Sequence, residues 1–277
     1  MTPGVTAPPP ENWKQLLSGQ AHALFAPLFA RLDAYPFPDC AALNALLDEC
    51  HRNAAGQAIS FVLPERTSRE EAYEARILRC GEIATRQDSW HDLFNALAWL
   101  TFPRIKRELN RLHCEHALVP SGKRGAVRDA LTLFDESGVI IACSDLSLAQ
   151  LLADFQWHAL FVQRRADVER HMRFFVLGHA LQEQMLRPYP GVTGKALILD
   201  CDAAFMHRPL AGQLRELDEC AAQWISRSGA LASTRALSPL PLLGIPGWDP
   251  ANAEAAYYDN TNVFRPGRRN AQVRSVE

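Results

Sequence analysis

Apolar residues recur at intervals of three and four positions along much of the chain, which is the spacing of one helix face. The longest such stretch covers residues 90–113 and reads WHDLFNALAWLTFPRIKRELNRLH. Because Phe102-Pro103 interrupts this pattern and proline suits a first helical turn, we expect two successive helices, the second beginning at Pro103. Asp88 or Ser89 would cap the first. Further helices are expected over residues 22–32, 40–51, 146–186 with a break near 164–167, and 210–225.

Shorter alternating runs predict strands and hairpins. Residues 59–63 and 195–199 fit single strands bounded by turn-forming residues. Residues 73–86 alternate well enough for a hairpin. A second hairpin is expected where LTLFDE and VIIAC flank Ser137-Gly138, because glycine readily adopts the positive φ of a tight turn.

The two ends of the chain differ in composition from the rest. Residues 1–11 are proline-rich and are expected to form a disordered tail. Residues 238–269 are rich in proline, glycine and aromatic side chains, and we expect them to wrap the body as ordered irregular structure. The sequence therefore predicts an α+β fold. It would be a single helix-rich globular domain over residues 12–277, with a few β-hairpins and a Pro/Gly/aromatic-rich C-terminal wrap.

Composition and charge exclude several classes of partner. The chain has 277 residues, 48% hydrophobic and 22% charged, which is ordinary for a globular protein. A formal net charge of −2 provides no general field for nucleic acid or an anionic membrane. No apolar run approaches the length of about 18 residues that a membrane helix needs. A small-molecule ligand is the expected partner. The basic run at Arg104, Lys106, Arg107 and Arg111 is interpreted as a solvated helix face.

The seven cysteines are scattered along the chain and form no Cys-x-x-Cys pair. This removes the common zinc and thioredoxin-like patterns. Scattered thiols suit a reducing compartment, and the N-terminus lacks the basic start and apolar core of a secretory signal. We therefore expect a cytoplasmic protein.

Polar side chains among the core-forming positions of the two successive helices mark a candidate site. Each unpaired polar group in a core costs about 1–3 kcal/mol, so these side chains need partners or a function. His91 and Asn95 are four positions apart and share a helix face. His113 borders the apolar row of the second helix, beside Asn110, and can face the same cavity as Asn95. Asp92 has a structural alternative, because it lies at the positive end of its helix dipole.

His179 and Glu183 form the strongest local pair of candidate residues. They are four positions apart in a segment expected to be helical, so the carboxylate can orient the imidazole or share a metal ion with it. Gly178 permits the close approach of another backbone. A buried structural hydrogen bond between the two side chains is the alternative.

The segment RDALTLFDESG supplies a third group of polar side chains. The favoured interpretation is structural: Arg128 and Asp129 clamp a neighbouring loop, while Asp135 and Glu136 shape the turn of the expected hairpin. The functional alternative places Arg128 and Asp129 against a substrate. Familiar catalytic patterns are absent from the sequence: it has no GxSxG elbow, Walker A loop, Rossmann glycine pattern or HExxH pair.

Together these segments resemble a known family. The chain is similar to the bacterial domain of unknown function 3025 family in ATRQDSWHDLFNALAWLTFPRIKRELNRLH, RDALTLFDESG, GHALQEQ, PLPLLGIPGW and NVFRPGR. The resemblance runs from about residue 25 to about residue 268. It implies a soluble bacterial protein of one domain, and it carries over no activity, substrate or cofactor. The positions that match the family's recurring polar residues are Arg86, Trp90, His91, Asp92, Asn95, Asn110, His113, Arg128, Asp129, Asp135, Glu136 and His179.

Two functions fit this pattern. In the first, the protein is an acid–base or metal-assisted hydrolase that acts on a small polar or anionic substrate. His179, oriented by Glu183, would be the general base or a metal ligand, since histidine titrates close to neutral pH. The catalytic residues would be His91, Asp92, His113, His179 and Glu183. The substrate would be held by Arg86, Asn95, Asn110, Arg128 and Asp129. The sequence specifies neither a metal nor another cofactor.

In the second, the same groups form a structural hydrogen-bond network in a non-enzymatic binding or scaffold protein. The aromatic surface near Trp248 and Tyr257-Tyr258 would then contact a protein or nucleic-acid partner. The two functions differ in one structural respect, which is whether the histidines and acids meet at a cavity that solvent can reach.

Overall fold

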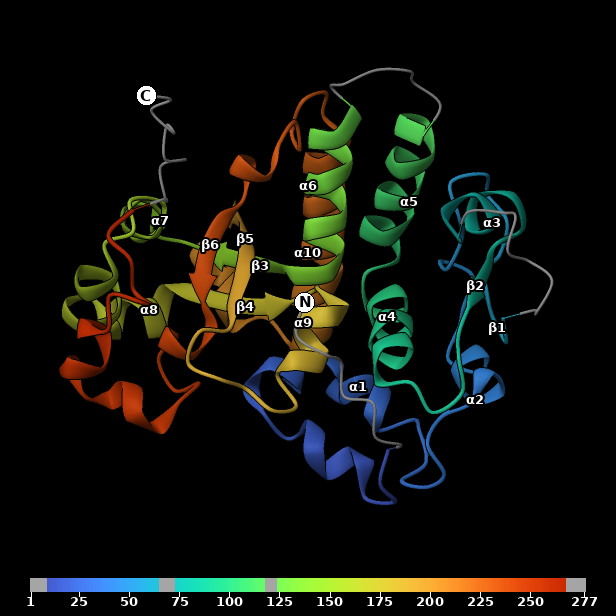
Figure 1. Ribbon diagram of the computed structural model, residues 1–277, viewed down its shortest axis with the longest axis horizontal. Coiled ribbons are helices and arrows are strands. Elements are labelled where there is room, and N and C mark those ends of the chain that lie inside the picture. Colours follow the sequence, from blue (N-terminus) through green and yellow to red (C-terminus); the bar gives the residue numbers. More distant parts are fainter. Residues whose placement is uncertain (1–8, 65–72, 118–123, 268–277) are drawn as a thin grey trace, which may run out of the picture.

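The structure, a computed structural model, describes residues 9–64, 73–117 and 124–267 (Figure 1). The helices are α1 (Ala26–Phe29), α2 (Cys40–Asn44), α3 (Tyr73–Cys80), α4 (Trp90–Thr101), α5 (Pro103–Ala117), α6 (Arg124–Ser137), α7 (Leu146–Ala153), α8 (Arg165–His171), α9 (His179–Gln184) and α10 (Leu210–Ser226). The strands are β1 (Ser60–Val62), β2 (Glu82–Ala84), β3 (Gly138–Cys143), β4 (Met172–Val176), β5 (Thr193–Asp200) and β6 (Ser238–Pro241). The predicted α+β fold class is confirmed.

A four-stranded mixed sheet with the strand order β4-β3-β5-β6 lies between two groups of helices. β3 pairs parallel with β5 and antiparallel with β4, while β6 closes the other edge antiparallel to β5. Figure 1 shows α6 and α10 on one side of this sheet and α7 and α8 on the other. β3 is buried along its whole length, as expected for a strand covered on both faces.

Side chains on β3 alternate between two apolar cores. Ile140 and Ala142 join the larger core, which includes α4, α5, α6 and α10. Val139 and Ile141 face the smaller core, which includes α7, α8 and the C-terminal wrap. The alternation follows from the two-residue period of a strand, so this single strand links both cores.

The hairpin predicted over residues 73–86 is wrong. The segment forms α3 followed by β2, and β2 pairs parallel with β1 in a separate two-stranded sheet. Tyr73, Ile77 and Cys80 are spaced for one helix face as well as for a strand. Gly81, with φ +73°, ends the helix in the left-handed conformation that glycine adopts most readily.

The second predicted hairpin, around Ser137-Gly138, is also wrong. Residues 124–137 form α6, whose Ala130, Leu131 and Phe134 are buried at helical spacing, and the chain passes directly into β3. A Cβ at Gly138 would lie 2.3 Å from the carbonyl oxygen of Phe134. Glycine is therefore needed for the close helix-to-strand junction rather than for a hairpin turn.

The mainly helical prediction for residues 146–186 is correct only in part. α7, α8 and α9 lie in this range, but Met172–Val176 forms β4 and pairs with β3. The apolar residues of that segment are therefore placed by strand pairing, and the single helical stripe expected from 172 to 186 does not form. α9 begins only at His179, with Gly178 as its N-cap residue.

Other local predictions are confirmed. α4 ends and α5 begins at Phe102-Pro103, and the Ser89 hydroxyl accepts a hydrogen bond from the Asp92 amide at 3.3 Å as the cap of α4. β1, β5 and α10 occupy the segments expected to form two strands and a helix. The helices expected over residues 22–32 and 40–51 form only in part. The first range contains the end of a 3-10 helix (Gln20–Phe25) and α1, and the second contains α2 followed by turns.

The C-terminal wrap is ordered irregular structure, as predicted. The Tyr258 hydroxyl donates to the Gly244 carbonyl at 2.8 Å, and the Asn252 side chain donates to the carbonyls of Leu243 and Ile245. Tyr258 is buried, whereas Trp248 and Tyr257 are partly exposed, so Tyr258 itself is not on the surface. A docking surface near Trp248 and Tyr257 stays a prediction. Residues 1–8 of the expected tail and 268–269 of the wrap lie outside the described residues.

All seven cysteines are free thiols. In the part of the chain that the structure describes, none of the helices combines the length and the apolar character needed to cross a bilayer.

His22 joins the N-terminal segment to α9 and carries a pH-dependent contribution to stability. Its buried ring stacks on Phe94, and its Nε2 lies 3.1 Å from the Gln182 carbonyl. Burial disfavours the charged imidazolium and lowers the pKa of His22 to about 4. The unfolded chain binds this proton near pH 6.5, so the free energy of unfolding falls as the pH decreases from that value toward 4.

We expect the wild type to lose about 2 kcal/mol more stability between pH 7 and pH 5 than His22→Phe, which keeps the stack on Phe94 but cannot titrate. Urea unfolding at both pH values measures the difference. Parallel pH dependences for the two proteins would show that folding does not lower the pKa of His22.

Candidate functional site

A cavity of about 480 Å³ opens among α3, α4, α5, α6 and α9. One face of α6 contributes Arg128, Thr132 and Asp135, which are spaced at four and three positions. The full lining consists of Pro64, Tyr73, Glu74, Ala84, Arg86, His91, Asp92, Asn95, His113, Arg128, Thr132, Asp135, Glu136 and His179. The cavity thus brings together polar residues that are far apart in the sequence.

Two histidines meet at the cavity wall with their ring centroids 4.5 Å apart and their planes at 82°. His91 is in the first turn of α4 and His179 is the first residue of α9, so the packing of these helices sets the contact. The Nδ1 atom of His91 lies 3.2 Å from Oε2 of Glu183, and this hydrogen bond raises the pKa of His91. Burial lowers the pKa of His179 to about 4. One ring is therefore held toward its charged form and the other toward its neutral form.

Asp135 faces His179 from α6. Its Oδ2 lies 3.7 Å from the buried Nδ1 of His179, and this nitrogen has no hydrogen-bond partner among the residues that the structure describes. Burial alone would raise the pKa of Asp135, but the charges of Lys106 and His179 outweigh that effect and lower it. The carboxylate is thus kept ionised next to an imidazole that can still gain a closer hydrogen bond.

Lys106 supports this arrangement from α5. It is only 4% exposed, and its ammonium donates to Oδ1 of Asp135 and, at 3.0 Å, to Oδ1 of Asn95. The ammonium also lies 5.6 Å from the centre of the Trp99 ring. Asn95 in turn donates to the Tyr73 hydroxyl at 2.8 Å. The expectation that Lys106 belongs to a solvated face is therefore wrong.

Arg86 and Asp92 form a bidentate pair at another part of the wall. The Asp92 carboxylate accepts from Nε, Nη2 and the backbone amide of Arg86 at 2.9, 2.8 and 2.7 Å. Burial would raise the pKa of Asp92, but these hydrogen bonds outweigh it and lower the pKa. Arg86 is thus already engaged by a carboxylate.

The remaining expected site residues divide into two groups. His113 and Arg128 line the cavity; burial lowers the pKa of His113, while Arg128 is exposed and has no ion pair within the described part of the chain. Asn110 and Asp129 do not line it. Asn110 is buried and donates to Glu74, which ties α5 to α3, and Asp129 is exposed.

The expected pairing of His179 with Glu183 is also corrected. Glu183 bonds to His91, and the carboxylate that faces His179 is Asp135. Asp135 and Glu136, interpreted from the sequence as turn formers, are instead part of α6 and line the cavity.

Three residues of this network, Lys106, Tyr73 and Glu74, were not predicted as site residues. For Lys106 a signal existed, because it shares a helical row with Asn110 and His113 at intervals of four and three positions. For Tyr73 and Glu74 the predicted hairpin concealed the helix that carries them.

The histidines and acids of this cavity do not converge as metal ligands. Among the described residues, the group whose ligand atoms do converge is Asp48, Cys50 and His51, outside the cavity. There Nδ1 of His51 already accepts the Asp48 amide at 3.0 Å, and its Nε2 lies 3.1 Å from the Leu100 carbonyl. Local hydrogen bonding accounts for that cluster.

Comparisons with known proteins give one match. A search of curated proteins and a search of solved structures found none. A family model with the description "Protein of unknown function (DUF3025)" matches residues 59–268, which include every residue that lines the cavity. Because this match covers more than half of the chain and agrees with the resemblance of its motifs, the chain belongs to the DUF3025 family.

Proposed function

We propose that the cavity among α3, α4, α5, α6 and α9 is the active site of an acid–base hydrolase that acts on a small polar or anionic substrate. The observation that carries this proposal is the contact of His91 with His179, whose pKa values are shifted in opposite directions. Two titratable groups with opposed environments can serve as acid and base at the same pH.

In this proposal His179 is the general base. Burial lowers its pKa to about 4, so the ring is neutral at pH 7 and its nitrogen is free of a proton. The charge of Asp135 acts in the opposite direction and would strengthen the ring as a base while it accepts a proton from the attacking water. Asp135, 3.7 Å from Nδ1, stabilises the imidazolium that forms. Such hydrogen bonds commonly shorten when a substrate binds.

His91 is the general acid. The Glu183 carboxylate accepts a hydrogen bond from Nδ1 of His91 and favours the protonated ring. His91 then donates a proton to the leaving group as the scissile bond breaks. Loss of the proton from His179 to solvent and uptake of a proton by His91 would restore both rings for the next turnover.

The lining supports direct attack by water and recognition of negative charge. Its described residues include no serine or cysteine, and the proposal assigns the attack to water that His179 activates. Arg128 has an exposed guanidinium without an ion pair in the described part of the chain, so it is available for a carboxylate or phosphate group. Arg86, engaged by Asp92, would instead hold the wall of the cavity.

A structural network in a binding protein is the second candidate, and one observation favours it. Many polar groups of the cavity are already paired, as in Arg86 with Asp92 and Lys106 with Asp135. Satisfied networks of this kind specify a core without catalysis. The opening of the cavity beside His91 and His179 favours the enzyme, since a substrate could reach both rings there.

A panel of p-nitrophenyl phosphates and carboxylic esters, with and without a chelator, tests the proposal. We expect turnover of at least one class, and a loss of about 10²-fold or more in kcat/KM for His179→Gln and for His91→Gln. Activity should also fall at alkaline pH as His91 loses its proton. His158→Gln, at an exposed histidine outside the cavity, is the matched control.

Circular dichroism and urea unfolding would establish that the variants fold. Folded His179→Gln and His91→Gln proteins that retain wild-type turnover would disprove the acid–base assignment. Absence of any turnover, together with unfolding of both variants, would support the structural network.

A further inference from the structure

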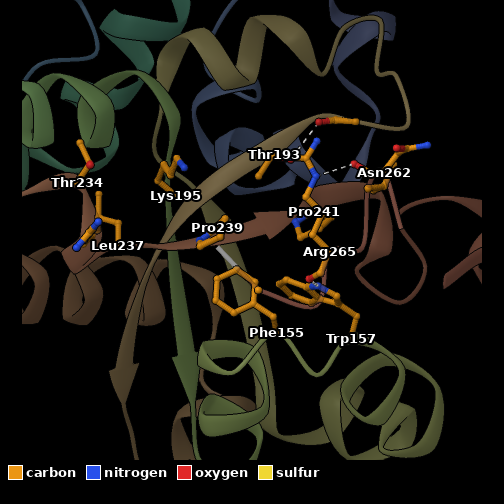
Figure 2. Close-up of a pocket in the computed structure, with 14 residues that line it drawn as sticks. Phe155, Trp157, Thr193, Lys195, Thr234, Leu237, Pro239, Pro241, Asn262 and Arg265 are labelled. Carbon is orange, nitrogen blue, oxygen red and sulfur yellow. Dashed lines mark hydrogen bonds between the residues drawn. The ribbon is translucent and has the colours of Figure 1, made fainter. Parts of the chain in front are cut away.

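A second cavity, of about 410 Å³, lies at the β6 edge of the four-stranded sheet and shares no lining residue with the first. Its walls come from β5, β6, the turn after α7 and the end of the C-terminal wrap. Figure 2 shows Lys195 and Thr234 toward one end, Asn262 and Arg265 toward the other, and Pro239 between them. The volume is in the range of about 300–1,000 Å³ typical of small-molecule sites.

Proline and aromatic side chains form part of the wall of this cavity. Pairing of Thr193 with Pro241 and of Lys195 with Pro239 places these residues on one face of the sheet. Trp157 closes the floor; it is buried, and its indole nitrogen donates to the Arg265 carbonyl at 2.7 Å. Fixed proline and aromatic rings form a rigid surface for a flat apolar group.

Phe155 supports a role for this surface. It has φ +59°, a left-handed conformation that is unfavourable for a residue with a side chain by about 1–2 kcal/mol. Its position follows the end of α7, where the Gln156 amide bonds to the Leu151 carbonyl at 2.9 Å, and glycine usually occupies this position. This chain has phenylalanine at that position. Its ring lines the cavity and makes an edge-to-face contact with Trp157, with the ring centroids 5.7 Å apart. Backbone strain of this kind concentrates at ligand sites.

The rim of the cavity is cationic. Lys195, Arg235 and Arg265 line it, whereas no aspartate or glutamate is among the described lining residues. The Nε atom of Arg265 donates to the Asn262 carbonyl at 3.2 Å. Among the described residues its two terminal amino groups have no acceptor, so they can bind an anionic group. The proline and aromatic rings, together with the exposed guanidinium of Arg265, therefore fit the two halves of an amphiphilic ligand.

We propose that this second cavity binds a small molecule that combines a flat apolar ring with an anionic group, either a carboxylate or a phosphate. The ring would pack between Phe155, Pro239 and Trp157, and the anionic group would lie at Arg265. Recognition of both halves is needed, because an exposed arginine binds a lone anion weakly in water.

Isothermal titration calorimetry on the full chain tests this proposal with four probes. Indole-3-acetate and AMP carry a ring with a carboxylate or a phosphate, so they distinguish the two kinds of anion. Indole-3-acetamide lacks the charge, and acetate lacks the ring. We expect indole-3-acetate or AMP to bind at least about tenfold more tightly than the acetamide and than acetate.

Two variants assign binding to this cavity. Arg265→Gln removes the charge and keeps the carbonyl that holds Trp157, and it should weaken binding about tenfold. Phe155→Gly removes the ring and relieves the left-handed strain, so it should weaken binding without lowering Tm. Arg31→Gln, an equal change of charge outside the cavity, should bind like the wild type.

The proposal fails if neither indole-3-acetate nor AMP binds, if indole-3-acetamide binds as tightly as they do, or if Arg265→Gln is indistinguishable from Arg31→Gln. It also fails if Arg128→Gln abolishes binding, since the ligand would then occupy the first cavity. Should Phe155→Gly unfold, Arg265→Gln alone decides the outcome.

Discussion

Lys106→Met is expected to lower the free energy of unfolding by about 3–5 kcal/mol. Methionine fits the space of the buried lysine stem, but Asp135 then loses the ammonium that offsets its desolvation. Asn95 loses its donor at the same time. Urea unfolding monitored by circular dichroism measures the change, and the pKa of Asp135, followed by carbon-detected NMR, should rise.

Double and neighbouring variants separate this effect from a simple loss of packing. Lys106→Met combined with Asp135→Asn should recover much of the lost stability, because no unpaired buried charge remains. Arg107→Met, at the adjacent and more exposed position, should change stability by less than about 1 kcal/mol. A Lys106→Met protein as stable as the wild type would show that Asp135 does not depend on Lys106.

Gly178→Ala is expected to destabilise the protein by about 3 kcal/mol and to disturb the site. A Cβ at this position would lie 2.5 Å from the Glu136 carbonyl oxygen and from the Ser137 amide nitrogen, both of which are backbone atoms. α9 must then move away from the junction of α6 and β3, and His179 moves with it. A displacement of about 1 Å at a catalytic group can reduce activity by about 10²-fold.

Gly212→Ala provides the matched control. This glycine is inside α10, and a Cβ there would come no closer than 4.0 Å to Arg208. Alanine is a better helix former than glycine, so we expect a gain of about 0.5–1 kcal/mol. If Gly178→Ala matched this gain, the close approach of α9 to the α6–β3 junction would be incorrect.

Many residues of the candidate site could be predicted from the sequence, because they are polar residues within stretches of regularly spaced apolar positions. His91, Asn95 and His113 fall among apolar positions of two helices whose boundaries at Ser89 and Pro103 are marked by capping and proline. Helical spacing then indicated which of these side chains share a face. All three line the cavity, and so do Arg128 and His179.

The sequence did not predict which side chains form hydrogen bonds or ion pairs with one another. The spacing of His179 and Glu183 is correct for α9, but Glu183 bonds to His91, which is 92 positions away. Lys106 has the local pattern of a solvated lysine, and Asp135 that of a turn residue. Each becomes a buried charge only because α5 and α6 pack together and place the two side chains in contact.

The sequence alone determined the α+β class, the α4–α5 boundary and the set of polar residues in apolar surroundings, because periodicity, caps and proline act over a few residues. Only the tertiary structure decided that Met172–Val176 is a strand, since its partner is β3. The same applies to the pairing of His91 with Glu183 and of Lys106 with Asp135. Strand pairing and buried ion pairs depend on contacts between distant segments, and these override the local preference of each segment.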